Sequence, residues 1–374
     1  MGRSLIRTSA WPVDTGSRCR FAPVSGRRCA MTVASEGVVR IEGCRQRSRG
    51  PERWGQAHRL VETRDLDRQA WLAIRQGGIG GSDAAAAVGL HPYRSPLELW
   101  LDKTGRQGET GSESADPKSP AWWGQLLEPT VADAYAQVTG RKVRRVNAIL
   151  QHPEHSWMIA NLDREVVGDP QVQILEVKTT GPWEAKRWRD GVPEHVQLQV
   201  QHQLAVTGMQ AADVAVLIGG QNLEIYRIDR DEAVIDRLIA LEQAFWRLVE
   251  IDTPPPPDGS DSAGQALKAL YPESQSGQTL DLQEDAELGR SFAELQRLRE
   301  TIAEQRRREE SLKQRIQAAM GEAEKAVFPT GTVTWKRSAP SKRVDTKALQ
   351  ADCPDLVAAY QQQVPGSRRF TIRD

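Results

Sequence analysis

Hydrophobic positions between residues 59 and 252 follow two different periods, and each change of period separates a helix from a strand. Apolar residues at helical spacing occupy 65–76, 95–105, 122–140, 194–207 and 231–250. Short apolar runs of strand length occupy 143–151, 156–160, 163–168, 172–178, 213–220 and 222–229. This order of helices and antiparallel strands predicts an α/β chain of the α+β kind, with a mixed central β-sheet flanked by helices.

A glycine-rich segment, GGIGGSD at 77–83, directly follows the first predicted helix. We expect a loop there, with Ser82 or Asp83 as the N-cap of a short helix over AAAAV. Gly140 follows the long helix and is expected to end it.

Three other segments differ from this central domain in composition. Residues 1–58 are rich in Arg, Ser and Gly, so we expect either disorder or an extension translated from an upstream start. Residues 253–283 begin with TPPPPDGSDSAG and are expected to be a linker. Residues 284–374 are expected to hold a long coiled-coil-like helix over 284–325 and a small basic module. The helix carries a partial heptad seam of Leu295, Leu298, Ile302, Leu312, Ile316 and Ala319.

The charge layout gives no direct argument for nucleic-acid binding by the central segment. The whole chain has a net charge of zero, but residues 59–256 contain 21 Lys and Arg against 28 Asp and Glu, a net of −7. Such a segment can still act on phosphates if some of its carboxylates hold divalent cations, because the cations reverse the local field.

Several protein classes do not fit the composition. No apolar run approaches the roughly 18–20 residues that span a membrane, and the N-terminus lacks a secretory apolar region, so we expect a cytoplasmic protein without membrane contact. The four cysteines show no CxxC spacing, which supports neither a disulfide framework nor a zinc site.

The run ILEVKTT at 174–180 places two charges inside an apolar strand. Glu176 and Lys178 are two residues apart, so they point to one face while Leu175 and Val177 point to the other. An edge-strand salt bridge would explain the pair without any catalytic role. However, Asp163 lies at a bend between two short strands upstream, and Glu128 lies on the long helix. Three carboxylates and a lysine in apolar surroundings are typical of a magnesium-dependent phosphodiesterase centre.

Five segments in order resemble those of a known family. They are GIGGSDAAAAVGLHPYRSPLELWLDKTG, GQLLEPTVADAYAQVTG, RRVNAILQHPEHSWMIANLDREVVG, ILEVKTT and LQVQHQLAVTG, and the similarity around them spans about 65–250. These segments resemble the YqaJ-type viral recombinases, which are lambda-exonuclease-like members of the PD-(D/E)XK nuclease superfamily. The proline of the superfamily motif is replaced here by Leu162, before Asp163, and the chemistry requires only the acid.

The resemblance implies a role for each matching residue in the centre. Asp163 and Glu176 would bind the metal, together with the backbone carbonyl of Val177. Glu128 would approach a second metal, usually through water. Lys178 would position the attacking water, and Gln201 would contact the site.

The same resemblance implies that Arg75 and Ser82 hold a terminal 5′-phosphate. The residues support this assignment independently, because a glycine-rich turn at a helix N-terminus can bind an anion and a guanidinium can grip phosphate with two hydrogen bonds. The alternative for the loop is a simple tight turn with a cap.

The resulting expectation is a Mg²⁺-dependent deoxyribonuclease, with Mn²⁺ as the alternative ion, that digests double-stranded DNA from its ends in the 5′ to 3′ direction. The resemblance also implies a single-strand annealing protein as partner and a homo-oligomeric, ring-shaped trimer. Two alternatives remain at this stage. One is an endonuclease of restriction or repair style with the same centre, and the other is a non-catalytic DNA-binding assembly protein with a vestigial nuclease fold.

Overall fold

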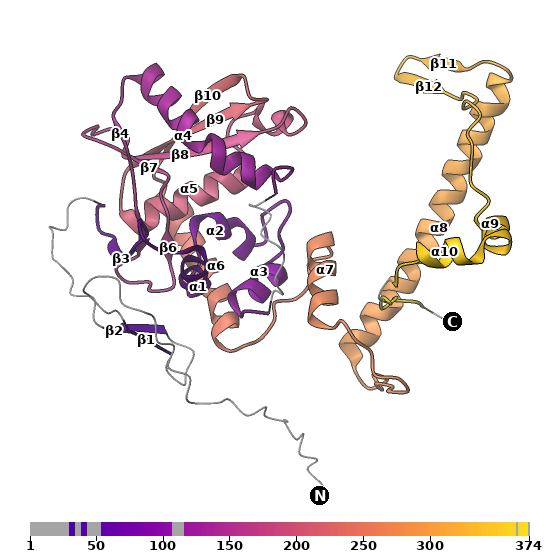
Figure 1. Cartoon of the computed structure of the whole chain (residues 1–374), viewed down its shortest axis with the longest axis horizontal. Helices are drawn as coiled ribbons and strands as arrows, with labels where there is room; N and C mark the ends of the chain where they lie inside the picture. The colour runs from indigo at the N-terminus through magenta and orange to yellow at the C-terminus, as the bar shows by residue number, and fades with distance from the viewer. Residues whose placement is uncertain (1–29, 34–38, 43–53, 107–115, 364–365, 373–374) are drawn as a thin grey trace, which may run out of the picture. The chain divides into compact units, whose positions relative to one another are not determined.

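The computed structural model describes residues 30–33, 39–42, 54–106, 116–363 and 366–372 of the chain. It divides into two compact units, Met1–Leu270 and Tyr271–Asp374 (Figure 1). The first unit contains every predicted site residue.

A five-stranded mixed sheet forms the centre of the first unit. Its strand order is β10-β9-β8-β7-β4, and only β8 and β9 run parallel, while the other neighbours are antiparallel. The strands are β10 (Asn222–Asp229), β9 (Ala211–Ile218), β8 (Ile174–Thr180), β7 (Arg164–Val166) and β4 (Val143–Arg145). The predicted fold class, a mixed sheet flanked by helices, is confirmed.

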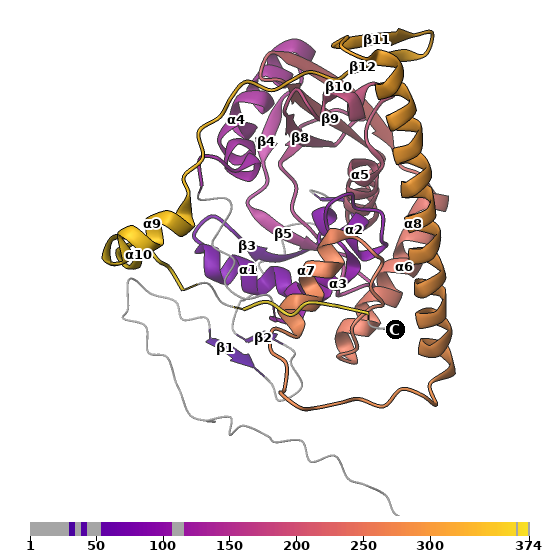
Figure 2. The same cartoon turned by 90° about the vertical axis from the view of Figure 1, so that its right-hand side faces the viewer.

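Two helices cover opposite faces of this sheet (Figures 1 and 2). Helix α4 (Pro120–Thr139) packs on the face that carries Leu175 and Val177, and helix α5 (Glu194–Thr207) packs on the face that carries Ile174. The alternation along β8 therefore separates two cores, as the period of two predicts. Gly140 ends α4 in the left-handed conformation at φ 71°, which a glycine adopts without strain.

A second, three-stranded antiparallel sheet contains β3 (His58–Glu62), β5 (Ala148–Gln151) and β6 (Ile159–Ala160). The single strand predicted over 143–151 is wrong, because β4 and β5 belong to different sheets. The chain changes sheet at Val146 and Asn147, where the carbonyl of Asn147 accepts a hydrogen bond from the Thr63 N–H at 3.0 Å. The strand pattern does not reveal such a change, since both halves are extended, although β4 is largely exposed and β5 is buried.

Four helices surround these sheets: α1 (Arg68–Gln76), α2 (Gly81–Ala87), α3 (Pro96–Lys103) and α6 (Glu232–Glu250). Helix α1 begins later than predicted, since Asp67 caps it by accepting from the Ala70 N–H at 2.8 Å. Helix α2 also differs from the expected cap. Its N-cap is Gly80, and Asp83 lies in its first turn and accepts the Gly80 N–H at 3.1 Å.

The first unit extends beyond both predicted domain limits. Trp54 and Ala57 pack against its core, and Gln56 donates to the Ala205 carbonyl at 2.9 Å, so the ordered part begins before residue 59. Most of the segment 1–53 lies outside the described residues, apart from the antiparallel pair β1 (Ala30–Val33) and β2 (Val39–Glu42). The predicted linker contains helix α7 (Asp261–Leu270), whose Ser262 hydroxyl accepts from the Ser95 N–H at 2.8 Å.

The second unit is built on helix α8 (Ala286–Met320), whose N-cap is Asp285. It also contains a hairpin of β11 (Lys325–Phe328) and β12 (Gly331–Thr334), followed by α9 (Thr346–Asp352) and α10 (Pro354–Ala359). Within the unit, Leu298 and Ile302 of the heptad seam are each 49% exposed, and coiled-coil pairing stays a prediction. Among the described residues of both units, we find no helix of the length and apolar character that a membrane crossing requires.

Candidate functional site

Glu176 and Lys178 lie side by side on β8 and face helix α5. The Lys178 Nζ is 2.8 Å from Glu176 Oε1, so the salt bridge considered from the sequence exists. It does not lie on an edge strand, because β8 is hydrogen-bonded to β7 on one side and to β9 on the other. Glu176 is 3% exposed, whereas the Lys178 side chain is 28% exposed. The Lys178 side chain therefore lies between the buried Glu176 carboxylate and the solvent.

Asp163 joins this pair from the start of β7. The antiparallel register pairs Arg164 with Leu175, so Asp163 stands next to Glu176 across the two strands. Its Oδ2 accepts the Val177 N–H at 2.9 Å. Burial and then the Glu176 charge raise the pKa of Asp163 to about 8, although Lys178 and the Val177 N–H act in the opposite direction. Burial and the neighbouring carboxylate thus both disfavour the ionised form of Asp163.

The pKa of Lys178 is raised although its ammonium group is buried. Burial lowers the pKa of this ammonium group, but the charge and hydrogen bond of Glu176, with a contribution from Asp163, outweigh it and raise the pKa. Lys178 is therefore a cation and a hydrogen-bond donor, and it does not act as a base in this arrangement.

Glu128 reaches the edge of the cluster from α4 but has a different partner. Its Oε1 accepts from Arg164 Nη1 at 2.5 Å, and the same nitrogen donates to the Asp163 carbonyl at 2.6 Å. The Glu128 charge also contributes to the raised pKa of Asp163, which places it near the cluster. The sequence-based expectation did not include this arginine, which follows Asp163 directly in the chain.

Gln201 does not reach the cluster, and its predicted contact with the site is wrong. Its amide nitrogen donates to the Asp229 carbonyl at 2.8 Å, and its oxygen accepts from the Asp231 N–H at 3.1 Å, which joins α5 to the turn before α6. Gln201 is two positions away from both Gln199 and Gln203. Residues two apart on a helix are about 200° apart around its axis, so Gln201 cannot share a face with these two glutamines.

Two other glutamines of α5 occupy the expected place. Gln199 Nε2 donates to Glu176 Oε1 at 2.6 Å, and Gln199 Oε1 accepts from Lys178 Nζ at 2.8 Å. Gln203 Nε2 donates to Glu176 Oε2 at 2.8 Å. The two residues are separated by four positions, which places both on one face of a helix. Gln197 and Gln201 have the same spacing, so the sequence alone does not show which pair faces β8.

The donor set suits a hard divalent cation. The described ranges contain no group of three or more His, Cys, Asp or Glu side chains that forms a metal shell by itself. Asp163 and Glu176 nevertheless supply adjacent carboxylates, and Mg²⁺ often uses only one or two carboxylates together with water and phosphate oxygens. Glu128 holds Arg164 through Oε1 alone.

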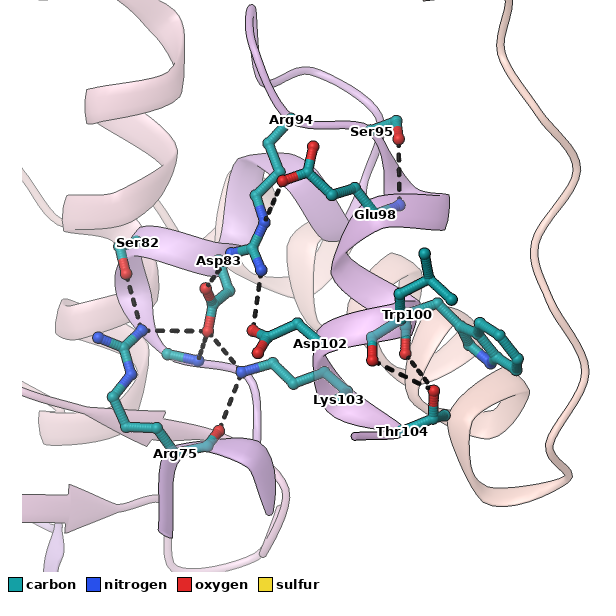
Figure 3. Close-up of polar contacts among 12 residues, drawn as sticks. Arg75, Ser82, Asp83, Arg94, Ser95, Glu98, Trp100, Asp102, Lys103 and Thr104 are labelled. Atoms are coloured by element: carbon teal, nitrogen blue, oxygen red, sulfur yellow. Dashed lines mark hydrogen bonds and ion pairs between the residues drawn. The ribbon is translucent and has the colours of Figure 1, made fainter. Parts of the chain in front are cut away.

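Arg75 and Ser82 meet in a second polar cluster, as the resemblance implied (Figure 3). Arg75 Nη2 donates to Ser82 Oγ at 2.8 Å and lies 3.1 Å from Asp83 Oδ2. Asp83 is also bound by Lys103 Nζ at 2.8 Å and by Arg94 Nη1 at 3.0 Å. Burial alone would raise the pKa of Asp83, but Lys103, Arg75 and Arg94 outweigh it and hold the pKa far below its usual range.

This cluster borders a pocket of about 210 Å³. Three cations surround one buried carboxylate, although Arg94 is also paired with Asp102 at 2.8 Å. The Arg75 guanidinium stacks over the Trp71 ring at 4.9 Å, and its side chain is 20% exposed. Asp83 and Trp71 thus hold Arg75 in place while leaving part of its guanidinium open to the pocket.

Comparisons with known proteins agree with the motifs. Residues 70–210 match the YqaJ-like viral recombinase domain. The uncharacterized protein YqaJ of Bacillus subtilis (strain 168) is 36% identical over 319 residues, which cover 84% of this chain and 97% of that protein.

Two solved structures show weaker likeness. An alkaline exonuclease (LHK-Exo) from Laribacter hongkongensis is 24% identical, with a TM-score of 0.41 over 49% of this chain and 93% of that chain. A phage related exonuclease from Haemophilus somnus 129PT is 12% identical, with a TM-score of 0.32 over 46% of this chain and 94% of that chain. The family assignment depends on the sequence relative, whose length this chain matches almost completely. The chain belongs to the YqaJ-like viral recombinase family.

Proposed function

We propose that this protein is a metal-dependent DNA nuclease that digests double-stranded DNA from its ends in the 5′ to 3′ direction. The observation that carries the proposal is the convergence of Asp163, Glu176 and Lys178 on neighbouring strands, two acids and one ammonium group in a largely buried place. Membership of a viral recombinase family supports DNA as the substrate.

Each residue of the cluster has a role in the proposed hydrolysis. Asp163 and Glu176, with the backbone carbonyl of Val177, would hold Mg²⁺ or Mn²⁺. The chemistry that the ion supplies when bound is Lewis-acid stabilisation of the charge that develops on the phosphodiester. Lys178 orients the attacking water and stabilises developing negative charge through its ammonium group. Water attacks phosphorus, the bond to the 3′-oxygen breaks, and the products carry a 5′-phosphate and a 3′-hydroxyl.

The cluster of Arg75 and Ser82 supports recognition of a DNA end. A terminal 5′-phosphate carries more charge than an internal phosphodiester, and the Ser82 hydroxyl and Arg75 guanidinium can both donate to it. The segment 59–256 has a net charge of −7, so binding to phosphate requires such local groupings of cations. An end-binding pocket favours an exonuclease over the endonuclease alternative.

Two further proposals concern partners. A single-strand annealing protein would coat the strand that the nuclease exposes. Assembly of the chain into a ring-shaped trimer would keep a protein with an acidic central segment on its substrate by enclosing the duplex. Sedimentation of the purified protein tests this assembly, and a strict monomer at working concentration would contradict it.

Lys178→Ala, assayed for cleavage and for DNA binding, tests the centre. We expect cleavage to fall by at least about 100-fold, within the range that electrostatic catalytic groups provide, with DNA binding retained. Lys186→Ala, on the exposed surface of the same unit, is the matched control and should cleave like wild type. Unchanged cleavage by Lys178→Ala would remove the lysine from the mechanism. DNA binding by the wild-type protein without any cleavage would favour the non-catalytic alternative.

A comparison of linear and covalently closed DNA, each with Mg²⁺, tests dependence on ends. We expect degradation of the linear form alone, and faster degradation of ends that carry a 5′-phosphate. Arg75→Ala should remove that preference while leaving the cluster on β8 intact. Equal rates on closed circles would support the endonuclease alternative.

A further inference from the structure

Gln203 is the most deeply buried side chain that touches the candidate centre. It is 1% exposed, and its Nε2 donates both to Glu176 Oε2 at 2.8 Å and to the Asn161 carbonyl at 3.3 Å. Its Oε1 is buried and has no hydrogen-bond partner among the described residues. The side chain therefore uses its donors fully and leaves its acceptor unsatisfied.

The surroundings determine which way this amide points. Both groups that face the nitrogen, a carboxylate and a backbone carbonyl, are acceptors and have no hydrogen to donate. Rotating the amide would place its oxygen against Glu176 and create repulsion between two acceptors. A buried oxygen without a partner costs stability, so an apolar side chain of equal size would be at least as good for packing alone. The unsatisfied oxygen thus indicates that the two N–H groups are what this position requires.

Helix α2 fixes the position of this side chain from the opposite side. A Cβ atom on Gly81 would lie 3.3 Å from the Cγ atoms of both Gln199 and Gln203. Any side chain at residue 81 would press on the two glutamines that hold Glu176. Gly81 precedes Ser82 in the first turn of α2, so the turn that carries the proposed phosphate contact also packs against the two glutamines that hold Glu176.

We propose that Gln203 is a positioning residue, which holds the Glu176 carboxylate in the orientation needed to bind the divalent cation. This inference rests on the proposed nuclease function and deepens it. Gln199 binds the oxygen of Glu176 that also pairs with Lys178, whereas Gln203 binds the other oxygen. With both oxygens held, the carboxylate cannot rotate about its terminal bond.

The test compares Gln203→Met with Gln201→Met, two substitutions of similar size on the same helix. Gln201 is also buried and also makes two hydrogen bonds, but to the turn before α6, so it controls for general loss of stability. Mn²⁺ binding is measured by isothermal titration calorimetry without DNA, and kcat and KM are measured on linear DNA with Mg²⁺. For Gln203→Met we expect about tenfold weaker Mn²⁺ binding, a typical loss when a group that supports a ligand is removed. We also expect a lower kcat with unchanged KM, and Gln201→Met should match wild type in both assays.

A second variant keeps the test informative if Gln203→Met does not fold. Gln203→Asn retains the amide but shortens it by one methylene, so it should lose the contact with Glu176 and show the same defects. Wild-type Mn²⁺ affinity and kcat in a folded Gln203 variant would overturn the positioning role alone. A wild-type protein that neither binds Mn²⁺ through Glu176 nor cleaves DNA would overturn the nuclease proposal and this inference together.

Discussion

Asp83 is the shared counter-ion of the polar cluster that contains Arg75 and Ser82. Its replacement by asparagine provides a quantitative test of how much this charge stabilises the fold. Asp83 is 2% exposed and contacts three cations, Lys103, Arg75 and Arg94. Asp83→Asn preserves the shape of the side chain and removes its charge. The cations then keep their positions but lose their shared counter-ion.

The size of the effect follows from the burial of Lys103. Its side chain is only 2% exposed, and its Nζ also donates to the Arg75 carbonyl at 2.9 Å. Removing one member of a buried ion pair costs about 3–5 kcal/mol, because the remaining charge is left uncompensated. Arg75 and Arg94 are 20% and 23% exposed, so water can screen part of their loss. We therefore expect Asp83→Asn to lower the free energy of unfolding by about 3–5 kcal/mol.

Urea denaturation at several pH values measures this contribution and its sign. The pKa of Asp83 is lower in the folded state than in the unfolded chain. The Asp83 charge therefore stabilises the fold fully at pH values above the pKa of an unfolded aspartate, about 3.9. As pH falls below that value the unfolded chain binds a proton that the folded chain does not, and the advantage of wild type over Asp83→Asn should shrink.

Two further variants decide whether the reasoning holds. Asp102 pairs with Arg94 but is 29% exposed, so Asp102→Asn should cost less than about 1 kcal/mol. Adding Lys103→Met to Asp83→Asn removes the stranded charge and should restore part of the lost stability. The account is refuted if Asp83→Asn costs no more than Asp102→Asn, or if the double variant is less stable than Asp83→Asn alone.

Three other predictions concern buried contacts of the first unit. His202 Nδ1 lies 2.8 Å from Glu242; burial lowers the pKa of His202, but Glu242 outweighs it and raises the pKa. Stability from this pair is therefore complete below about pH 6.5 and declines as pH rises through the folded pKa, and His202→Gln should flatten urea midpoints measured from pH 6 to 9. Gly81→Ala should reduce kcat on linear DNA by crowding the two glutamines that bind Glu176, and wild-type kcat in this variant would count against the close packing. Tyr135 donates to the buried Asp213 at 2.6 Å, so Tyr135→Phe should cost about 1–3 kcal/mol in urea denaturation, and a neutral result would mean that Arg141 alone satisfies the carboxylate.

Local patterns in the sequence predicted the parts of the site that depend on neighbours in the chain. The period of two along ILEVK places Glu176 and Lys178 on one face of β8, and a strand must keep that alternation wherever it packs. Arg75 and Ser82 are separated by one helix end and a tight glycine loop, so their contact also follows from a short stretch of chain. For the same reason the helices over 194–207 and 231–250 appear within one residue of their predicted ends.

The tertiary structure alone decided which residues meet across the fold. Helix α5 is buried along both of the faces that carry Gln201 and Gln203, so no polar stripe in its sequence shows which face β8 contacts. Gln201 was expected at the site because of the family resemblance, whereas the structure places Gln199 and Gln203 against Glu176. Likewise, only pairing with distant strands assigns β4 to one sheet and β5 to the other. Side-chain period is a local property of a sequence, whereas the partner of each face is a property of the assembled chain.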